Sequence, residues 1–134
     1  MLSLFRFVQW IREVRSVIIL NDGKQSRDFT YVDDIARGTV AALKPVGYSV
    51  FNLGSDRPAV LLDVVKIIER LLGKRAVLEF TESHPADVRE TWANITRARQ
   101  FLDWEPVVCL EEGIAKLVEW YEQNRSWACE IDTA

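Results

Sequence analysis

Several residue types are scarce in this sequence, and each scarcity argues against a kind of site. The six glycines are scattered along the 134 residues, so there is no G-x-G-x-x-G or G-x-x-G-x-x-G turn of the kind that binds phosphates after a strand. The chain has one histidine and two cysteines, Cys109 and Cys129, which lack the spacing of metal ligands. A zinc site, a hydrolytic triad and a disulfide framework are therefore not expected.

Long apolar runs and blocks of like charge are also missing. Near the N-terminus, Arg6, Arg12 and Arg15 interrupt the apolar residues well before membrane-spanning length. The net charge is −3, and acidic and basic residues are interspersed, which argues against a nucleic-acid surface. The two unremarkable thiols are typical of a reducing compartment, so we expect a cytoplasmic protein with neither a membrane segment nor a nucleic-acid partner. A 49% hydrophobic content is enough for a core, and we expect one domain over residues 1–134.

Apolar residues at helical spacing predict five helices. They cover residues 4–14, 33–43, 61–72, 94–102 and a last segment after Pro106 whose buried face is Ile114, Leu117, Val118 and Tyr121. The first helix carries apolar residues on two faces and therefore needs two packing partners. Asp33 and Asn94 are expected to cap their helices. Val60 offers no capping oxygen before the third helix, and Gly73 supplies its left-handed C-terminal end.

Runs of β-branched and aromatic residues predict the strands. These runs are 16–20, 29–32, 48–53 and 76–80. We expect the run at 76–80 to pair with residues 17–20 in a small sheet. The run at 48–53 is apolar enough to be covered on both faces, as a strand of a parallel sheet would be.

The most informative stretch is GKQSRDFTYVDDIARGTVAAL, residues 23–43. It joins a glycine-containing turn, one arginine, a short β-type run and two aspartates that open an amphipathic helix. Five further motifs follow this stretch along the chain: 49–55 (SVFNLGS), Arg57-Pro58, Asp87-Val88, 91–94 (TWAN) and 110–114 (LEEGI). Taken together, the motifs resemble the NAD-dependent sugar-nucleotide epimerases and dehydratases of the extended short-chain dehydrogenase/reductase family. Among these, the UDP-glucuronate, UDP-glucose and UDP-galactose 4-epimerases are the most similar.

The resemblance runs over nearly the whole chain but corresponds only to the C-terminal part of such an enzyme. Family members begin with a strand, a glycine-rich turn and a helix, and they carry a Tyr-x-x-x-Lys pair for hydride and proton chemistry. Here Tyr31 is followed four residues later by Ile35, and Tyr48 by Asn52, so neither tyrosine can be the catalytic one. The resemblance implies that the chain alone binds no NAD and cannot catalyse.

The implied fold class is α/β, or α+β for the piece in isolation. It would consist of the substrate-binding small domain plus the last helix and strand of a Rossmann-type domain, without the N-terminal NAD-binding core. In a complete relative, the run 48–53 and the helix from Asp33 would pack on a sheet supplied by the missing half. Uncovered apolar elements of this kind promote association. We therefore expect a homo-oligomer or a complementing N-terminal chain.

Arg27 is the leading candidate site residue. A sugar nucleotide carries a diphosphate that needs a planar, permanently charged donor, and Arg27 stands where family arginines serve this purpose. The alternative interpretation is a surface ion pair with Asp28 or Asp22. The motif around Arg27 favours the diphosphate role.

Asp87 matches the family aspartate that accepts hydrogen bonds from the nucleotide ribose, because one carboxylate can bind both vicinal hydroxyls. Many relatives place an arginine or glutamine shortly before this aspartate, where this chain has Ser83 and His84. As an imidazolium, His84 could donate to a phosphate, although a lone loop histidine is more often without such a role. Arg89 is an alternative phosphate partner.

In relatives the uracil lies along a segment like Val17 to Leu20, so Ile18 and Leu20 are expected beside the base. Leu20 stands where an aromatic residue is common, which weakens stacking. The alternative is a core strand and nothing more. Thr91 occupies a place where some relatives direct a tyrosine toward the sugar.

Other residue groups are expected to be structural. Tyr31, Trp92 and Trp104 are interpreted as packing residues. The adjacent carboxylates Glu111 and Glu112 do not face each other on a helix, so they do not form an acid–base pair.

Three functional classes remain. The first is the substrate-binding part of a UDP-sugar 4-epimerase that acts only with a complementing chain. The second is a stand-alone module with weak affinity for UDP-sugars. The third is a folded remnant or oligomerisation element without a ligand.

Overall fold

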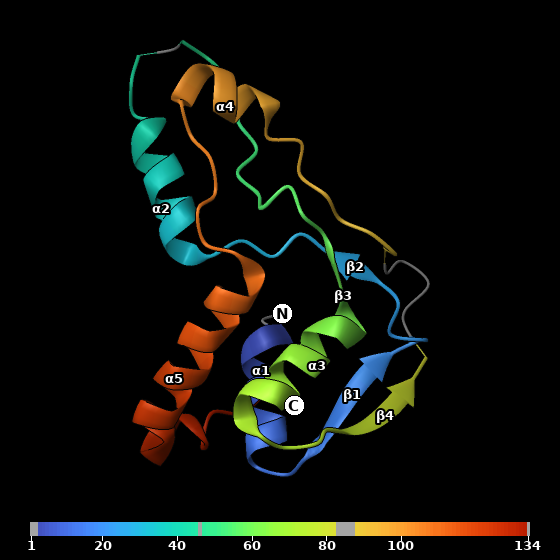
Figure 1. The fold of residues 1–134 in the computed structure, drawn as a ribbon. Helices are drawn as coiled ribbons and strands as arrows, with labels where there is room; N and C mark the ends of the chain where they lie inside the picture. Colours follow the sequence, from blue (N-terminus) through green and yellow to red (C-terminus); the bar gives the residue numbers. More distant parts are fainter. Residues whose placement is uncertain (1–2, 46, 83–87, 134) are drawn as a thin grey trace.

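The computed structural model describes residues 3–45, 47–82 and 88–133. The helices are α1 (Ser3–Arg12), α2 (Val32–Ala41), α3 (Leu61–Leu72), α4 (Thr96–Leu102) and α5 (Leu110–Ala128). The strands are β1 (Ser16–Leu20), β2 (Ser26–Arg27), β3 (Ala59–Val60) and β4 (Val77–Thr81). Figure 1 shows two regions, with α1, α3, α5 and the parallel strands β1 and β4 at one end and α2 and α4 at the other. We call the region of α1, β1, α3, β4 and α5 the large lobe, and the region of α2, α4 and their connecting segments the small lobe.

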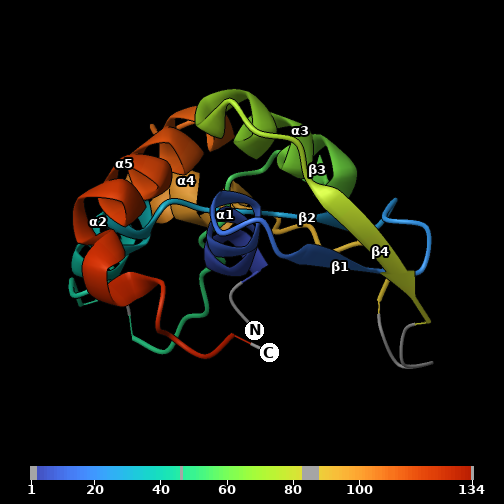
Figure 2. The ribbon, with the colours of Figure 1, turned by 90° about the horizontal axis from the view of Figure 1, so that it is seen from below.

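Helix α1 is the centre of the large lobe (Figure 2). Its buried apolar residues are Phe7, Val8, Trp10 and Ile11, and the polar Gln9 is buried among them. The helix packs against α3, α5 and β1, because its apolar residues occupy more than one face. The prediction of a first helix with several packing partners is confirmed.

Strands β1 and β4 pair in parallel, with Val17 opposite Leu78 and Ile19 opposite Phe80. On β1, Val17 and Ile19 are fully buried, whereas Ile18 and Leu20 are exposed. This alternation places one face of the strand against the large lobe, because successive side chains point to opposite faces. The predicted pairing of 76–80 with 17–20 is confirmed.

Helix α3 behaves as its sequence predicts. Val64, Val65 and Ile68 are buried on one face, and Gly73 adopts the left-handed conformation with φ 62° just after the last turn. Val60 precedes the helix without a side-chain cap. A glycine adopts this conformation without the steric cost that other residues meet.

The small lobe has a second, smaller core. Its buried residues are Ile95, Ala98, Leu102 and Trp104. The partly buried Phe51 and Leu53 pack against this cluster. The segment 48–53 therefore contributes side chains to the small lobe.

The predicted strand at 48–53 is wrong, since these residues form no ladder in the structure. Tyr48 is 96% exposed and Val50 is 59% exposed. β-propensity becomes a strand only when a neighbouring strand accepts and donates the backbone hydrogen bonds, and no described strand lies beside this run. The β-type run at 29–32 is also not a strand. The pairing occurs earlier, at Ser26–Arg27, and α2 already begins at Val32.

Two predicted caps differ from the structure. Asp33 lies in the first turn of α2, and the N-cap position is held by Tyr31. For α4 the N-cap position is Ile95, although the Asn94 side chain still accepts a hydrogen bond from the backbone N–H of Thr96 at 3.0 Å. Asn94 therefore satisfies an otherwise unbonded donor from one position earlier than predicted.

Candidate functional site

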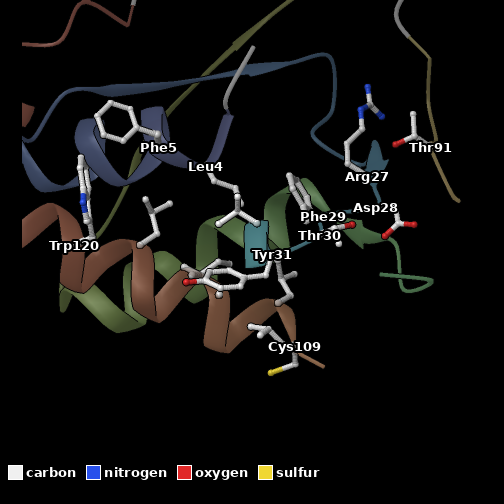
Figure 3. Close-up of a pocket in the computed structure, with 16 residues that line it drawn as sticks. Leu4, Phe5, Arg27, Asp28, Phe29, Thr30, Tyr31, Thr91, Cys109 and Trp120 are labelled. Carbon is white, nitrogen blue, oxygen red and sulfur yellow. The ribbon is translucent and has the colours of Figure 1, made fainter. Parts of the chain in front are cut away.

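A cavity of about 720 Å³ opens between α1, α5 and the segment that leads from β2 into α2 (Figure 3). Most of its walls are apolar, and these walls include Leu4, Phe5, Phe29, Tyr31, Val32, Val108, Leu110, Ile114, Leu117 and Trp120. Polar groups gather on one side of the cavity. They are Arg27, Asp28, Thr30 and Thr91, with Phe5 and Trp120 on the opposite side. A large apolar pocket with a few polar groups is the usual form of a binding site.

Backbone hydrogen bonds of the preceding residue, Ser26, hold Arg27 at this polar end. The backbone of Ser26 accepts a hydrogen bond from the N–H of Thr91 at 3.2 Å and donates to the carbonyl of Arg89 at 2.9 Å. The Arg27 guanidinium donates to the carbonyls of Ser26 at 2.8 Å and of Arg89 at 3.3 Å. The fold therefore brings Arg27, Arg89 and Thr91 together, although more than sixty residues separate Arg27 from the other two.

Asp28 fixes the backbone around these residues. One carboxylate oxygen accepts from the backbone N–H of Ser55 at 2.8 Å and from the hydroxyl of Ser55. The other accepts from the backbone N–H of Ala93 at 3.0 Å. At Gly54, an added Cβ would lie only 2.7 Å from the Asp28 oxygen, so glycine is required for this close approach. One carboxylate thus joins three chain segments beside the cavity.

The carboxylate of Asp34 also joins distant segments of the chain. It is fully buried and accepts from the guanidinium of Arg37 at 2.6 Å and from the backbone N–H groups of Val107 and Val108 at 3.1 and 3.0 Å. Burial alone raises the pKa of Asp34, but the hydrogen bonds from Arg37, Val108 and Val107 outweigh it, and the net pKa is lowered. The ionised Asp34 therefore ties α2 to the segment that carries Val108, a residue of the cavity wall.

The remaining sequence-predicted residues are placed as follows. Ile18 and Leu20 lie on the exposed face of β1 and are 41% and 39% exposed. Arg89 lines a separate cavity of about 510 Å³ that also contains Asn21 and Lys24. His84 and Asp87 lie outside the described residues.

The three aromatic residues that were predicted to be packing residues differ in burial. Trp104 is 2% exposed and donates to the carbonyl of Asp34 at 2.9 Å, so its predicted packing role is confirmed. Trp92 is 65% exposed, and its indole N–H donates to Asp56 at 2.9 Å, so its interpretation as a packing residue is wrong. Tyr31 lies in the cavity wall, and its ring is 4.8 Å from the ammonium of Lys116.

Asp28 and Gly54 were not identified from the sequence as site-forming residues. Asp28 follows Arg27 directly, and sequence reasoning treated it only as an ion-pair partner of that arginine. Gly54 gives no signal beyond its place in the 49–55 motif. Each has its role because of contacts with residues distant in the chain.

The described residues contain no glycine-rich turn of the kind that cradles the pyrophosphate of a dinucleotide. None of the described strands is followed by a glycine-containing turn that opens a helix, because β1 leads through Gly23 to β2 and the segment from β2 to α2 has no glycine. A pyrophosphate cradle of the Rossmann type needs that arrangement. Among the described residues there is also no group of three or more potential metal ligands. No described helix is long and apolar enough to cross a membrane.

Comparison with known proteins identifies the protein family to which the chain belongs. The mixed α/β fold matches part of a Rossmann-like epimerase. The model of the NAD dependent epimerase/dehydratase family matches residues 3–54, and the sequence and structural relatives described next cover most of the chain. The chain belongs to the NAD-dependent epimerase/dehydratase family.

The similar proteins include UDP-glucuronate 4-epimerases. The enzyme of that name from Thermodesulfobacterium geofontis is 48% identical over 124 residues, which are 92% of this chain and 38% of that protein. A crystal structure of UDP-glucuronic acid 4-epimerase from Bacillus cereus, in complex with UDP-glucuronic acid and NAD, is 35% identical with a TM-score of 0.86 over 92% of this chain and 40% of that one. An epimerase from Methanothermobacter thermautotrophicus has a TM-score of 0.90 at 26% identity, over 97% of this chain and 40% of that one. The chain therefore spans about two fifths of the length of these relatives.

Proposed function

We propose that this chain is the C-terminal, sugar-nucleotide-binding part of an NAD-dependent UDP-sugar 4-epimerase. The observation that carries the proposal is the position of Arg27 and Thr91 at the polar end of a cavity in a member of this family. The backbone carbonyl of Arg89 accepts hydrogen bonds from Ser26 and Arg27 beside them. The homologous Bacillus cereus structure contains UDP-glucuronic acid and NAD. The proposed ligand is a UDP-sugar, with UDP-glucuronate as the first to test.

In this proposal the Arg27 guanidinium binds the diphosphate. Its carbonyl partners at Ser26 and Arg89 hold the guanidinium plane beside the cavity, and a planar donor with several N–H groups matches phosphate oxygens. Arg89 and His84 remain alternative second phosphate partners. Asp87 is the proposed partner of the ribose hydroxyls.

The uracil would lie along the exposed face of β1, beside Ile18 and Leu20, where both side chains are only partly covered. Thr91 would face the sugar, since its side chain borders both the large cavity and a neighbouring one of about 320 Å³. Asp28, which follows Arg27, supports these contacts because its carboxylate accepts a hydrogen bond from the backbone N–H of Ala93, two residues after Thr91.

Catalysis is not proposed for this chain alone. No tyrosine stands four residues before a lysine, so the pair that carries the proton and hydride chemistry of the family is missing. NAD is not proposed as a ligand of the isolated chain, because the described residues do not form a cradle for it. When bound in a complete enzyme, NAD supplies the oxidation at C4 of the sugar and its reversal.

Isothermal titration with UDP-glucuronate tests the proposal, with NAD as a parallel ligand. Each charge-assisted hydrogen bond contributes about 1.5–3 kcal/mol before the cost of association, so the expected dissociation constant is about millimolar. Arg27→Ala should lower the affinity at least about fivefold, since one such bond of about 1.5 kcal/mol is worth more than that factor.

The matched control is Arg75→Ala. Arg75 precedes β4 at the opposite end of the β1–β4 pair, and its side chain is 93% exposed. It should bind UDP-glucuronate like the unmodified chain. If the unmodified chain gives no saturable heat with UDP-glucuronate, or if both variants bind alike, the proposed function is contradicted.

A further inference from the structure

Trp92 is an exposed tryptophan whose ring is held in one orientation. Its side chain is 65% exposed, and its indole N–H donates to a carboxylate oxygen of Asp56 at 2.9 Å. The other carboxylate oxygen of Asp56 accepts from the guanidinium of Arg99 at 3.0 Å. Fixing an exposed side chain costs rotamer freedom. A ring that is already fixed loses less of this freedom when a ligand binds to it, so Trp92 is preorganised for a contact.

Trp92 forms part of the wall of a cavity of about 320 Å³ that lies beside the large one. The two cavities share Asp28, Thr30 and Thr91, so they are neighbours across these residues. Asn52 contributes an amide group to the small cavity. Pockets that hold drug-sized ligands have volumes of about 300–1,000 Å³. The small cavity is therefore suited to one sugar ring rather than to a whole sugar nucleotide.

The backbone beside Trp92 is tied to the polar end of the large cavity. Thr91 donates its backbone N–H to the carbonyl of Ser26 at 3.2 Å, and Ser26 directly precedes Arg27. Arg27, Asp28 and Thr91 lie on the same side of the large cavity (Figure 3). A ligand whose phosphates contact Arg27 would therefore reach the small cavity past Thr91.

The side chains around the small cavity match the chemistry of a pyranose. A pyranose ring carries C–H groups on its faces and hydroxyl groups around its rim. The flat surface of an indole can cover such an apolar face, and hydroxyl and amide groups can bind the rim. Thr30, Thr91 and Asn52 supply these polar groups. Among the described residues that line this cavity there is no arginine or lysine, so a sugar ring fits it better than a diphosphate does.

We propose that Trp92 is the platform on which the hexopyranose ring of the sugar nucleotide stacks, with the ring inside the small cavity. The inference rests on the proposed function and deepens it. The diphosphate lies at Arg27, and Thr91 lies between the diphosphate and the ring. The platform contacts the C–H face of the ring and not the group at C6, so UDP-glucose and UDP-glucuronate should gain alike from it.

Trp92→Ala tests the stacking, with UDP as the matched ligand that lacks the sugar. By isothermal titration the variant should bind UDP-glucuronate about three- to tenfold more weakly than the unmodified chain, because an aromatic contact of this kind contributes about that factor. UDP-glucose should lose the same factor, and the affinity for UDP should not change. Trp92→Phe keeps an aromatic face and should lose less affinity for UDP-glucuronate than Trp92→Ala.

The control variant is Trp127→Ala on α5. Trp127 is also exposed, at 49%, and it is not among the described residues that line the two cavities. This variant should bind UDP and UDP-glucuronate like the unmodified chain. Because Trp92 and Trp127 are both largely exposed, both variants should keep their fold, and far-UV circular dichroism checks that they do.

The indole N–H of Trp92 gives a second readout, in the chain with its native side chain. Its NMR signal in the isotopically labelled chain is assigned by its loss in Trp92→Phe. The signal should shift when UDP-glucuronate binds and should stay in place when UDP binds. A tryptophan that only supports the loop would not distinguish the two ligands.

Three results would overturn this inference while leaving the proposed function in place. They are an unchanged affinity of Trp92→Ala for UDP-glucuronate, an equal loss of its affinity for UDP and UDP-glucuronate, and an indole signal that does not move when UDP-glucuronate binds. If neither ligand binds saturably to the unmodified chain, the proposed function is contradicted, and this inference with it.

Discussion

The two lobes of this molecule differ in how far they provide their own packing partners. In the large lobe, α1 is buried on several sides by α3, α5 and β1, and residues from all four elements are fully buried. In the small lobe the described apolar core consists of Ile95, Ala98, Leu102 and Trp104, and α2 presents Val32 and Val40 to solvent. The large lobe is therefore built to be stable within this chain. The small lobe leaves more of its apolar side chains exposed.

The two lobes should differ most in the free energy of unfolding that is lost when a core side chain is truncated. Ile68→Ala in α3 removes a fully buried side chain of the large lobe and should lower the free energy of unfolding by about 2–5 kcal/mol. Leu102→Ala in the small lobe should lower it by about 2 kcal/mol or less, because a small cluster can relax around the cavity. Urea unfolding measures both, and equal effects would remove the distinction between the lobes.

Asp34 links the small lobe to the cavity wall, so its neutralisation should loosen that lobe selectively. Asp34→Asn leaves Arg37 without its carboxylate and weakens the bonds to Val107 and Val108. The expected loss is about 1–3 kcal/mol. Hydrogen exchange should accelerate in α2 and in residues 104–108 more than in α1. Uniform acceleration across both lobes would show that they unfold as one unit.

The acid response should come in part from the large lobe. Two hydrogen bonds from Arg125, at 2.8 Å each, lower the pKa of Glu13 to about 2, and Tyr121 donates a third. A carboxyl with a depressed folded-state pKa stabilises the fold above its unfolded pKa, and this stability is lost as the pH falls through the folded value. Stability should therefore fall between about pH 5 and pH 2.

Glu13→Gln should remove much of that pH dependence and lower the stability at neutral pH by about 1–2 kcal/mol. Thermal unfolding at pH 7 and at pH 3 gives the comparison. The difference between the two pH values should be smaller in the variant than in the unmodified chain. An unchanged pH dependence would show that other carboxylates control the acid response.

The sequence predicted the helices of both lobes and the β1–β4 pair, whereas the strand predicted at 48–53 in the small lobe is wrong. Helices α1 and α3 and the pair β1–β4 are specified by local apolar patterns that find their partners inside the chain. The run 48–53 has the pattern of a strand but no described neighbouring strand. Gln9, in contrast, is a buried residue of the large lobe that the sequence pattern did not predict. It is fully buried, and its amide donates to carbonyls of Ala128 and Ile131 at 3.1 and 2.9 Å, contacts that no local pattern indicates.

The candidate site shows the same limit. The position of Arg27 was predicted from the motif around it, and the structure brings Arg89 and Thr91 beside it. The roles of Asp28 and Gly54 were not predicted, because they depend on the close approach of three distant segments. Motifs indicate which residue types are present, whereas long-range contacts decide which of them position the others.

The most direct test of the central claim is to titrate the isotopically labelled chain with UDP-glucuronate and follow its backbone amide signals by NMR. A sugar-nucleotide-binding part should show saturable shifts at Arg27, at Thr91 and along β1, with little change in α3. Shifts confined to other surfaces, or no shifts at millimolar ligand, would contradict the assignment of this chain as the UDP-sugar-binding part of an epimerase.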